Sequence, residues 1–485
     1  MASIATSAPA STDSSSAANG QTYRGPFAIM TVLFFLWGFI TVLNDILIPK
    51  LQDAFALTNY KIMFIQTAFF GAYFIGGLLY FVISTTAGDP IARIGYKNGV
   101  ALGLLLAALG SAMFWPAATL PSYPLFLGAL FVVGLGLTLL QIAANPYVTI
   151  LGPERTASSR LNLAQGFNSV GTTIGPLIGG YLIFQYFAES GVNGAASVRI
   201  PYLAFCIIFT VLALVFFFLH LPHVGEGKIE SGVGALKYPH VLLGVIAIFM
   251  YVGGEVSVGS NIIKFLGEKS VAGLSSLEAS KYVSLFWGGM LLGRFMGSVE
   301  LSEMKPAKKQ VFLIGIPVLG FLIFWLARSW DGAEHQFNFS DGWIIVKNYL
   351  PLLALCWLLF QFGKALAGRT LFIFSGTIVL LLAIAILVGG QWAMWCVVGV
   401  GLFTSIGWSN TFSLALEGTG IYKSQVSSLL VMAILGGAVL PPIMGKVADH
   451  FSRQSSFIVP LLAYGYVAFY GLKGHKIGRN RQPAV

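Results

Sequence analysis

Runs of about 20 apolar residues recur along this chain, and they constrain its fold more than any other feature. A helix of that length spans the hydrocarbon core of a bilayer, whereas the strands of a membrane barrel are shorter and alternate in polarity. Only 9% of the 485 residues are charged, against about 25% in soluble domains. The sequence therefore predicts an all-α membrane protein. We expect about fourteen helices, near 25–49, 60–86, 97–118, 124–150, 162–186, 201–219, 239–265, 281–301, 309–328, 349–366, 370–389, 391–414, 424–446 and 457–472.

Basic residues in the loops indicate the orientation in the membrane. With the N-terminus inside, the expected cytoplasmic segments hold 17 Lys and Arg and the opposite segments hold 10. Cytoplasmic loops of membrane proteins carry such an excess, so we expect both termini in the cytoplasm. The basic residues are scattered through loops beside apolar spans. The formal charge of +10 therefore predicts contact with a lipid bilayer and no binding of nucleic acid.

An internal repeat divides the chain into two halves. Sliding the sequence by 265 residues places Val132–Leu137 on Val397–Leu402, while the starts of the halves align at a shift of 215. The difference of about fifty residues is one helical hairpin, which we expect near 309–366. Two parallel repeats related by an axis along the membrane normal are the organisation of major facilitator transporters. The aligned pairs are Gly38 with Gly253, Asn145 with Asn410, Gly171 with Gly436, and Pro176 with Pro441.

The expected organisation follows from this repeat. A disordered tail covers 1–22, a six-helix bundle 23–219, a cytoplasmic linker 220–238, a second six-helix bundle with the inserted hairpin 239–472, and a cytoplasmic tail 473–485. Three cysteines, Cys206, Cys356 and Cys396, lie within apolar spans and form no disulfide framework or metal-ligand spacing. The sequence contains no paired His–acid motif, nucleotide-binding loop or metal cluster, so neither an enzyme nor a resident cofactor or metal is expected.

The first apolar run contains an amide and a carboxylate side by side, Asn44 and Asp45. An acid near the middle of a bilayer costs about 2.5–3.5 kcal/mol on insertion scales, so such a residue usually faces a cavity. Trp37, Thr41 and Asp45 recur every four residues and share one helix face. Asp45 is therefore a candidate coupling carboxylate inside a transport path. The alternative is an interfacial acid just beyond the end of a helix.

Amide side chains form rows on two further helices. Because amides in lipid need partners, a row of them predicts a wet cavity, and amides can donate to and accept from the hydroxyls of a sugar. The alternative for each amide is hydrogen bonding between helices. Tryptophans in the same region are candidates to stack on a sugar ring, with lipid-facing or core positions as the alternative. The candidate substrate-binding residues are Asn44, Gln141, Asn145, Asn162, Gln165, Asn168, Asn261, Asn410, Trp37 and Trp287.

A second intramembrane acid, Glu255, lies in the helix that opens the second half. Arg294, in the next helix, either neutralises an acid or extends to the cytoplasmic interface. The nearby Glu300 and Lys305 favour the interface. Gly88-Asp89 with Arg93 loosely resembles the Asp–Arg gating motif that facilitators carry in the loop between their second and third helices.

Several motifs together resemble the fucose–galactose–glucose cation symporters of the major facilitator superfamily. They are Asn44–Pro49, Phe69–Phe74, Ala143–Tyr147, Arg160–Gln165 with Phe167–Ser169, Tyr251–Ser260, Gly293–Phe295 and Phe403–Leu416. The resemblance implies that Asp45 is the cation-coupling carboxylate and Gln165 a cavity amide near the sugar. Fucose–proton symporters carry Glu where this chain has Gln141, whereas glucose/galactose-type members resemble it at Gln141 and Glu255.

The resemblance implies a transporter in the bacterial inner (plasma) membrane that takes up a neutral hexose of the glucose/galactose type with a cation. We expect it to be a monomer. A proton would bind at Asp45, whereas sodium would be liganded by Asp45 or Glu255 together with amide or backbone oxygens. An L-fucose or amino-sugar symporter of the same family is the alternative. A sugar sensor that binds without transporting is the rival from another class, but the linker and tails offer no signalling domain.

Overall fold

The computed structural model describes residues 22–55, 59–120, 122–181, 199–219, 232–331 and 336–479. Most of the expected N-terminal tail, linker residues 220–231 and the last six residues lie outside the described residues. The side chains of 42–63 and 176–181 also lie outside them. This set includes the side chains of Asn44 and Asp45, whose backbone belongs to the first helix.

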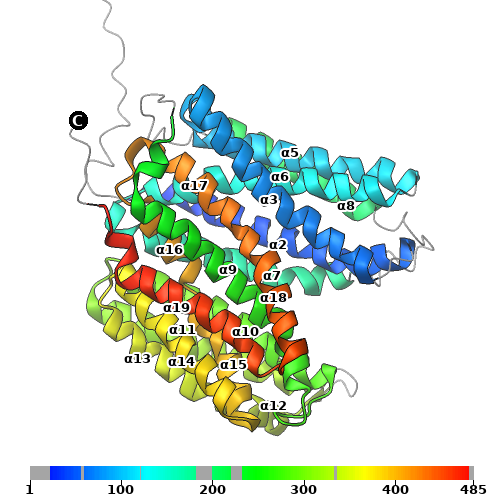
Figure 1. Cartoon of the computed structure of the whole chain (residues 1–485), viewed down its shortest axis with the longest axis vertical. Coiled ribbons are helices and arrows are strands. Elements are labelled where there is room, and N and C mark those ends of the chain that lie inside the picture. Colours follow the sequence, from blue (N-terminus) through cyan, green and yellow to red (C-terminus); the bar gives the residue numbers. More distant parts are fainter. Residues whose placement is uncertain are drawn as a thin grey trace, which may run out of the picture.

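Helices dominate the fold and form two bundles (Figure 1). The bounds of the first bundle are α2 (Arg24–Phe55), α3 (Asn59–Ala87), α5 (Tyr96–Thr119), α6 (Tyr123–Ile150), α7 (Ala157–Tyr181) and α8 (Arg199–Phe218), with the short α4 (Pro90–Ile94) between α3 and α5. Those of the second are α9 (Pro239–Leu266), α10 (Ser276–Glu300), α14 (Ala367–Leu387), α15 (Gly390–Thr404), α16 (Gly407–Leu416), α17 (Lys423–Met432), α18 (Gly436–His450) and α19 (Ile458–Leu472).

An extra helical hairpin stands between α10 and α14, as the repeat predicts. It consists of α11 (Pro306–Ser329), then α12 (Phe339–Val346) and α13 (Leu350–Gly363). Two-residue strands β1 (Trp330–Asp331) and β2 (Gln336–Phe337) pair antiparallel at its tip, with Trp330 opposite Phe337. The hairpin packs against α10 and α14. It therefore lies beside the second bundle, away from the contact between the bundles (Figure 1).

Twelve segments within the described residues are long and apolar enough to cross a membrane. Three of these segments consist of two consecutive helices that together make one membrane crossing: α12–α13, α15–α16 and α17–α18. Two more long helices, α7 and α10, lie in the bundles and carry more polar residues. The expected total of about fourteen helices therefore corresponds to helices in the structure, although individual ends differ by several residues. The segment expected at 349–366, for example, begins at Phe339.

Equivalent glycines hold the first and fifth helices of each half together. A Cβ on Gly171 would overlap the carbonyl oxygen of Phe35, bringing α7 against α2, and a Cβ on Gly38 would overlap the backbone of Asn168. A Cβ on Gly436 would likewise overlap the carbonyl oxygen of Phe249, bringing α18 against α9. Glycine permits this close approach because it has no side chain. The same packing in both halves confirms the parallel repeat.

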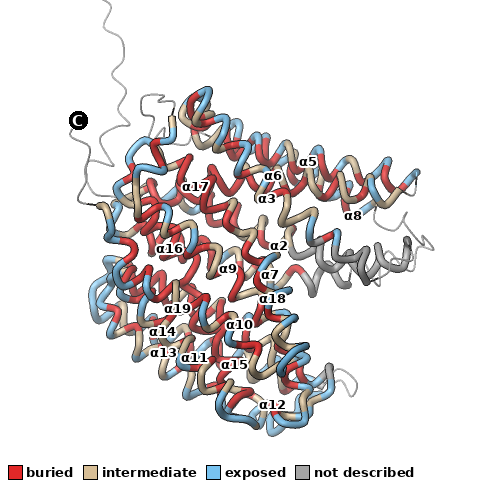
Figure 2. Tube along the Cα trace, viewed as in Figure 1, coloured by how far each residue is buried: buried red, intermediate tan, exposed pale blue. Residues whose placement is uncertain are grey.

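The bundles meet at the end that carries the C-terminus and the beginning of α9, and they separate toward the other end (Figure 1). Buried residues are concentrated where they meet (Figure 2). The contacts between the bundles join α7 to α10 and α16, and α3 and α6 to α17. The structure therefore shows a two-bundle molecule that is closed at this end, called the terminal side below.

Candidate functional site

Arg294, near the C-terminal end of α10, connects the two bundles. Its Nη1 donates to the carbonyl oxygen of Gln165 at 3.3 Å and to the hydroxyl of Ser169, both on α7. Its Nε donates to the carbonyl oxygen of Ser405 at 3.3 Å. The side chain is buried, at 9% exposure. The expectation that Arg294 extends to the interface is therefore wrong, because acceptors inside the protein satisfy the guanidinium.

A break in a membrane helix supplies one of these acceptors. Helix α15 ends at Thr404 and α16 begins at Gly407. Broken helices of transporters expose backbone groups to a binding site, where they can serve polar partners. A Cβ on Gly293 would overlap the Ser405 side chain, and one on Gly407 would overlap the Tyr251 ring. The two glycines therefore let α9 and α10 approach this break closely.

Glu255 of α9 lies beside this arginine. Its carboxylate interacts electrostatically with Arg294 and is adjacent to the Tyr251 hydroxyl. That hydroxyl donates to the carbonyl oxygen of Thr404 at 3.1 Å. The Glu255 Oε2 atom is buried and has no hydrogen-bond partner within the described part of the chain. Glu255, Tyr251 and Arg294 thus form a polar group against the broken helix, in which the acid and the arginine carry opposite charges. The Glu255 Oε2 atom remains able to accept a hydrogen bond.

The first bundle contributes a second polar group. Tyr73 of α3 hydrogen-bonds the side chain of Gln141 on α6, and both are buried. A Cβ on Gly437 of α18 would lie 3.1 Å from Phe70 and 3.2 Å from Val252. Since Phe70 lies one turn before Tyr73, this contact brings the face of α3 that carries the Tyr73–Gln141 pair close to α9.

Trp37 and Asn168 lie at the contact between α2 and α7. Trp37 is half-buried and meets the ring of Phe34 edge-on, with centroids 5.3 Å apart. The Asn168 amide donates to the carbonyl oxygen of Phe34 at 3.0 Å. The structure therefore uses the amide nitrogen of Asn168 for packing inside the bundle. The side-chain oxygen of Asn168 takes no part in this hydrogen bond, and its role in sugar binding stays a prediction.

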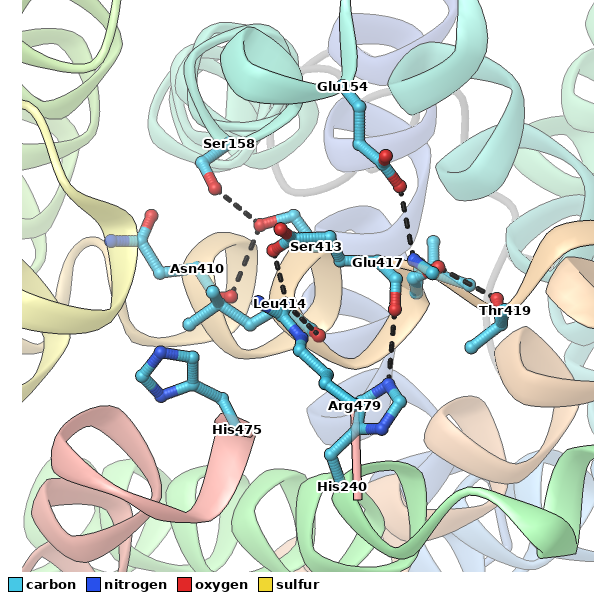
Figure 3. A network of polar contacts seen from close by, with 12 residues as sticks. Glu154, Ser158, His240, Asn410, Ser413, Leu414, Glu417, Thr419, His475 and Arg479 are labelled. Atoms are coloured by element: carbon cyan, nitrogen blue, oxygen red, sulfur yellow. Dashed lines mark hydrogen bonds and ion pairs between the residues drawn. The ribbon is translucent and has the colours of Figure 1, made fainter. Parts of the chain in front are cut away.

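Two of the predicted binding amides, Asn162 and Asn410, pair across the contact between the bundles. Asn162 Nδ2 donates to Asn410 Oδ1 at 2.8 Å, and one turn away the hydroxyls of Ser158 and Ser413 are hydrogen-bonded. Figure 3 shows the serine pair beside Asn410. Asn162, Asn410 and Asn145 are fully buried. Their position is on the terminal side, where the bundles are closed.

Asn261 and Trp287 lie away from the terminal side. The Asn261 Oδ1 accepts from Arg453 Nη1 at 3.5 Å, and Arg453 also pairs with Glu268 at 3.1 Å. Trp287 is 43% exposed and packs over Gly259. The structure thus brings together Gln165, Glu255 and Arg294, and separately Gln141 and Tyr73. It places Asn261 and Trp287 nearer the opposite end.

Three contributors to the Arg294 cluster were missed from the sequence: Ser169, Thr404 and Ser405. The last two act through backbone carbonyls, which no side-chain pattern reveals. One signal was present, since the apolar span at 391–414 is interrupted by Thr404-Ser405-Ile406-Gly407. Polar and glycine residues inside a hydrophobic segment are a pointer to a broken helix.

Asp89 connects the bundles at the loop between α3 and α5. Its carboxylate accepts from Tyr80 Oη at 2.5 Å and from Ile91 N at 2.9 Å, and it caps α4. The carboxylate also lies beside Ser424 at the start of α17, whose hydroxyl donates to Tyr96 Oη at 3.4 Å. Burial raises the pKa of Asp89 above its ordinary 3.8. The loose match to a gating motif therefore falls on a residue that contacts both bundles, and its gating role stays a prediction.

Two parallel bundles, a broken helix and a buried ionic group at their contact are the architecture of a secondary transporter. The comparison with protein families agrees. Residues 27–357 match the Major Facilitator Superfamily, and the chain belongs to that superfamily, within the family of glucose/galactose and fucose symporters.

The relatives match over nearly the full length. A glucose/galactose transporter of Brucella abortus is 42% identical, covering 98% of this chain and 99% of the relative. The L-fucose–proton symporter of Escherichia coli is 30% identical, covering 94% of each chain. A crystal structure of the transporter FucP in the outward conformation is 27% identical, with a TM-score of 0.70 and coverage of 92% of this chain and 97% of that one.

Proposed function

We propose that this protein is a secondary active transporter that takes up a neutral hexose, of the glucose/galactose type, together with a cation. The observation that carries the proposal is the 42% identity to a glucose/galactose transporter over nearly the whole chain. The two polar groups near the bundle contact, around Arg294 and Gln141, support it. They offer donors and acceptors at a position that sugars reach in a transporter of this fold.

The cation in this proposal is a proton. Two relatives carry proton coupling in their names, the fucose symporters of Escherichia coli and Haemophilus influenzae. Asp45 is the proposed proton site, and Glu255 is its proposed partner. Glu255 suits a coupling role because it is buried beside Arg294 and its Oε2 has no hydrogen-bond partner among the described residues.

Transport in this proposal is a rocking of the two bundles. With both termini in the cytoplasm of a bacterial inner membrane, the closed terminal side is the cytoplasmic side. The structure is then an outward-facing state, like the related crystal structure. The sugar is proposed to contact Gln165, Gln141, Asn168, Trp37 and, from the outer end, Trp287 and Asn261. Asn162 and Asn410 are proposed to close the cytoplasmic side.

Sugar uptake into liposomes tests this function. Purified protein is reconstituted, and labelled galactose uptake is measured with an imposed proton gradient, an imposed sodium gradient, or neither. Accumulation driven only by the proton gradient is the expected result, with glucose and galactose competing better than fucose. Binding without any gradient-driven uptake or counterflow would make the protein a sensor and refute the proposal.

A further inference from the structure

A cavity of about 750 Å³ lies on the terminal side, between the ends of the two bundles. We call it the terminal-side cavity. Its walls include Glu154, Arg155 and Ser158 of the first bundle and Arg369, Lys476 and Arg479 of the second. Because both bundles line it, the cavity has this shape only while the terminal side is closed.

The two bundles touch directly at this cavity (Figure 3). Ser158 hydrogen-bonds Ser413, and the Glu154 carboxylate accepts from the Gly418 amide at 3.2 Å. Arg479 pairs with Glu417. A ligand in the cavity would therefore rest against groups that already hold the closed state together.

Positive charge exceeds negative charge on the walls. The lining residues contain four Lys and Arg but only the two acids Glu154 and Glu417. Arg155 is paired with Glu303 and Arg479 with Glu417. Arg369 and Lys476 form no ion pair with any residue that the structure describes, and both are exposed at the cavity. Burial lowers the pKa of His475, so its ring is neutral near pH 7 and adds no charge.

Two unpaired cations suit a phosphate group, which accepts strong hydrogen bonds from Lys and Arg. The volume is far larger than inorganic phosphate requires, and the remaining wall contains Leu366, Phe372 and Leu472 beside the serine hydroxyls. A sugar ring presents both apolar C–H faces and hydroxyls. We propose that the terminal-side cavity binds a phosphorylated sugar and thereby stabilises the closed terminal side, which inhibits uptake.

This inference rests on the proposed function, which makes the terminal side cytoplasmic and the cargo a hexose. A kinase reaction that consumes the imported hexose would supply the ligand on that side. Because the ligand binds the closed state alone, it stabilises that state by mass action, and closure in turn strengthens binding of the ligand. Transport would then slow as the phosphorylated product accumulates.

Equilibrium binding of labelled galactose 6-phosphate tests the site. The full chain is placed in nanodiscs of neutral lipid, and Arg369→Ala with Lys476→Ala is compared with Lys473→Ala, an exposed lysine outside the cavity lining. A charge-assisted contact contributes about 1.5–3 kcal/mol, so the double variant should lose affinity at least about tenfold while the control keeps it. Equal affinity in the double variant would overturn the proposal.

Two further arms separate the sources of phosphate. Inorganic phosphate should compete only weakly, and nanodiscs with anionic lipid should leave galactose 6-phosphate binding unchanged. If anionic lipid abolishes galactose 6-phosphate binding, and the lipid itself binds only when Arg369 and Lys476 are present, the site belongs to a lipid headgroup and the proposal fails. Absence of binding in all arms also overturns it.

Uptake distinguishes failure of the site from failure of the proposed function. Galactose uptake is measured in liposomes with and without galactose 6-phosphate on the side of the cavity. Uptake in empty liposomes tests the proposed function alone. The trapped ligand should slow uptake by the wild type but not by the double variant. A Ser158→Cys, Ser413→Cys disulfide should abolish uptake yet retain galactose 6-phosphate binding, because it keeps the cavity assembled.

A separate observation concerns the repeat. The 265-residue shift carries Asn145 to Asn410 and Asn162 to Ser427. The two residues of the Asn162–Asn410 hydrogen bond, on α7 and α16, thus correspond to Ser427 on α17 and Asn145 on α6. Those helices also pack together. Both side chains are fully buried, and neither has a hydrogen-bond partner within the described residues.

Buried polar groups without partners cost about 1–3 kcal/mol each, so such groups call for an explanation. The contacts around them place α6 beside α17: Ser424 lies 3.4 Å from Tyr96 Oη, and Tyr96 stacks on Tyr147. We infer that Asn145 and Ser427 are the second half of a symmetric contact between the bundles, and that a rotation of the two side chains within the closed terminal side pairs them.

Crosslinking tests this pair. In a chain whose three native cysteines are replaced by serine, Asn145→Cys with Ser427→Cys should form a disulfide under oxidant as readily as Asn162→Cys with Asn410→Cys. The crosslink should stop uptake, and a reductant should restore it. If only the Asn162–Asn410 pair crosslinks, the symmetric closure is refuted.

Discussion

Ser169→Ala should open the terminal side. In the wild type, the Ser169 hydroxyl accepts a hydrogen bond from Arg294 and so joins α7 of one bundle to α10 of the other. A hydrogen bond to a charged group contributes about 1.5–3 kcal/mol. With tenfold in an equilibrium per 1.4 kcal/mol, the closed state should lose about 10- to 150-fold in population relative to the open state.

Maleimide labelling measures this shift. Asn162 is fully buried against Asn410 in the closed state and does not line the terminal-side cavity, so an Asn162→Cys probe in a chain without its native cysteines reacts only after opening. The labelling rate from the terminal side should rise by at least about tenfold in the Ser169→Ala variant.

Thr173→Val is the matched control. The Thr173 hydroxyl donates to the carbonyl oxygen of Ser169 within α7, at 2.7 Å, and forms no hydrogen bond with the other bundle among the residues that the structure describes. Its loss should leave the labelling rate unchanged. An unchanged rate in Ser169→Ala, or an equal rise in both variants, would refute the view that Arg294 holds the bundles together.

Three further outcomes are expected. Asp45→Asn should abolish galactose accumulation against a gradient while leaving counterflow, and full accumulation by this variant in liposomes would contradict a coupling role. Asp89→Asn should flatten the pH dependence of the melting temperature. Burial raises the pKa of Asp89 above 3.8, so the folded state holds its proton more tightly than the unfolded chain. The wild type should therefore lose stability as the pH rises from about 4 through the raised pKa, and an equal slope in the variant would exclude Asp89 as its source. Gly436→Val should lower stability by about 1–3 kcal/mol because its side chain would meet the carbonyl oxygen of Phe249, whereas Gly445→Val, with open space around it, should melt close to the wild type.

Much of the fold could be predicted because hydrophobic length and internal repeats are local or periodic features. The glycine pairs occupy equivalent positions when the two halves of the sequence are aligned, and the structure shows that they have the same packing role. Gly171 and Gly436 each allow the fifth helix of a half to pack closely against its first helix. The hairpin between α10 and α14 was visible as a difference between two alignment shifts.

The site was harder to predict, because a polar residue in a membrane helix can serve either a cavity or a contact between helices. Asn162 and Asn410 are of the residue type expected in a polar cavity, yet their side chains hydrogen-bond to each other across the contact between the bundles. Arg294 was expected at the interface since charged neighbours follow it in the sequence. Its acceptors are the Ser169 hydroxyl and the carbonyls of Gln165 and Ser405. The residue types point to the helix break, but they do not reveal that α7 crosses beside it.

Arg294 connects the charge of Glu255 to the closure of the terminal side. The same guanidinium neutralises Glu255 and donates to α7 of the opposite bundle. Any event that changes the charge or the contacts of Glu255 must change how strongly Arg294 holds α7. A ligand can shift the bundles only by the difference in its affinity for the two states. Sugar or proton binding next to Glu255 would supply that difference through Arg294, with no need for contact between the ligand and the closed end.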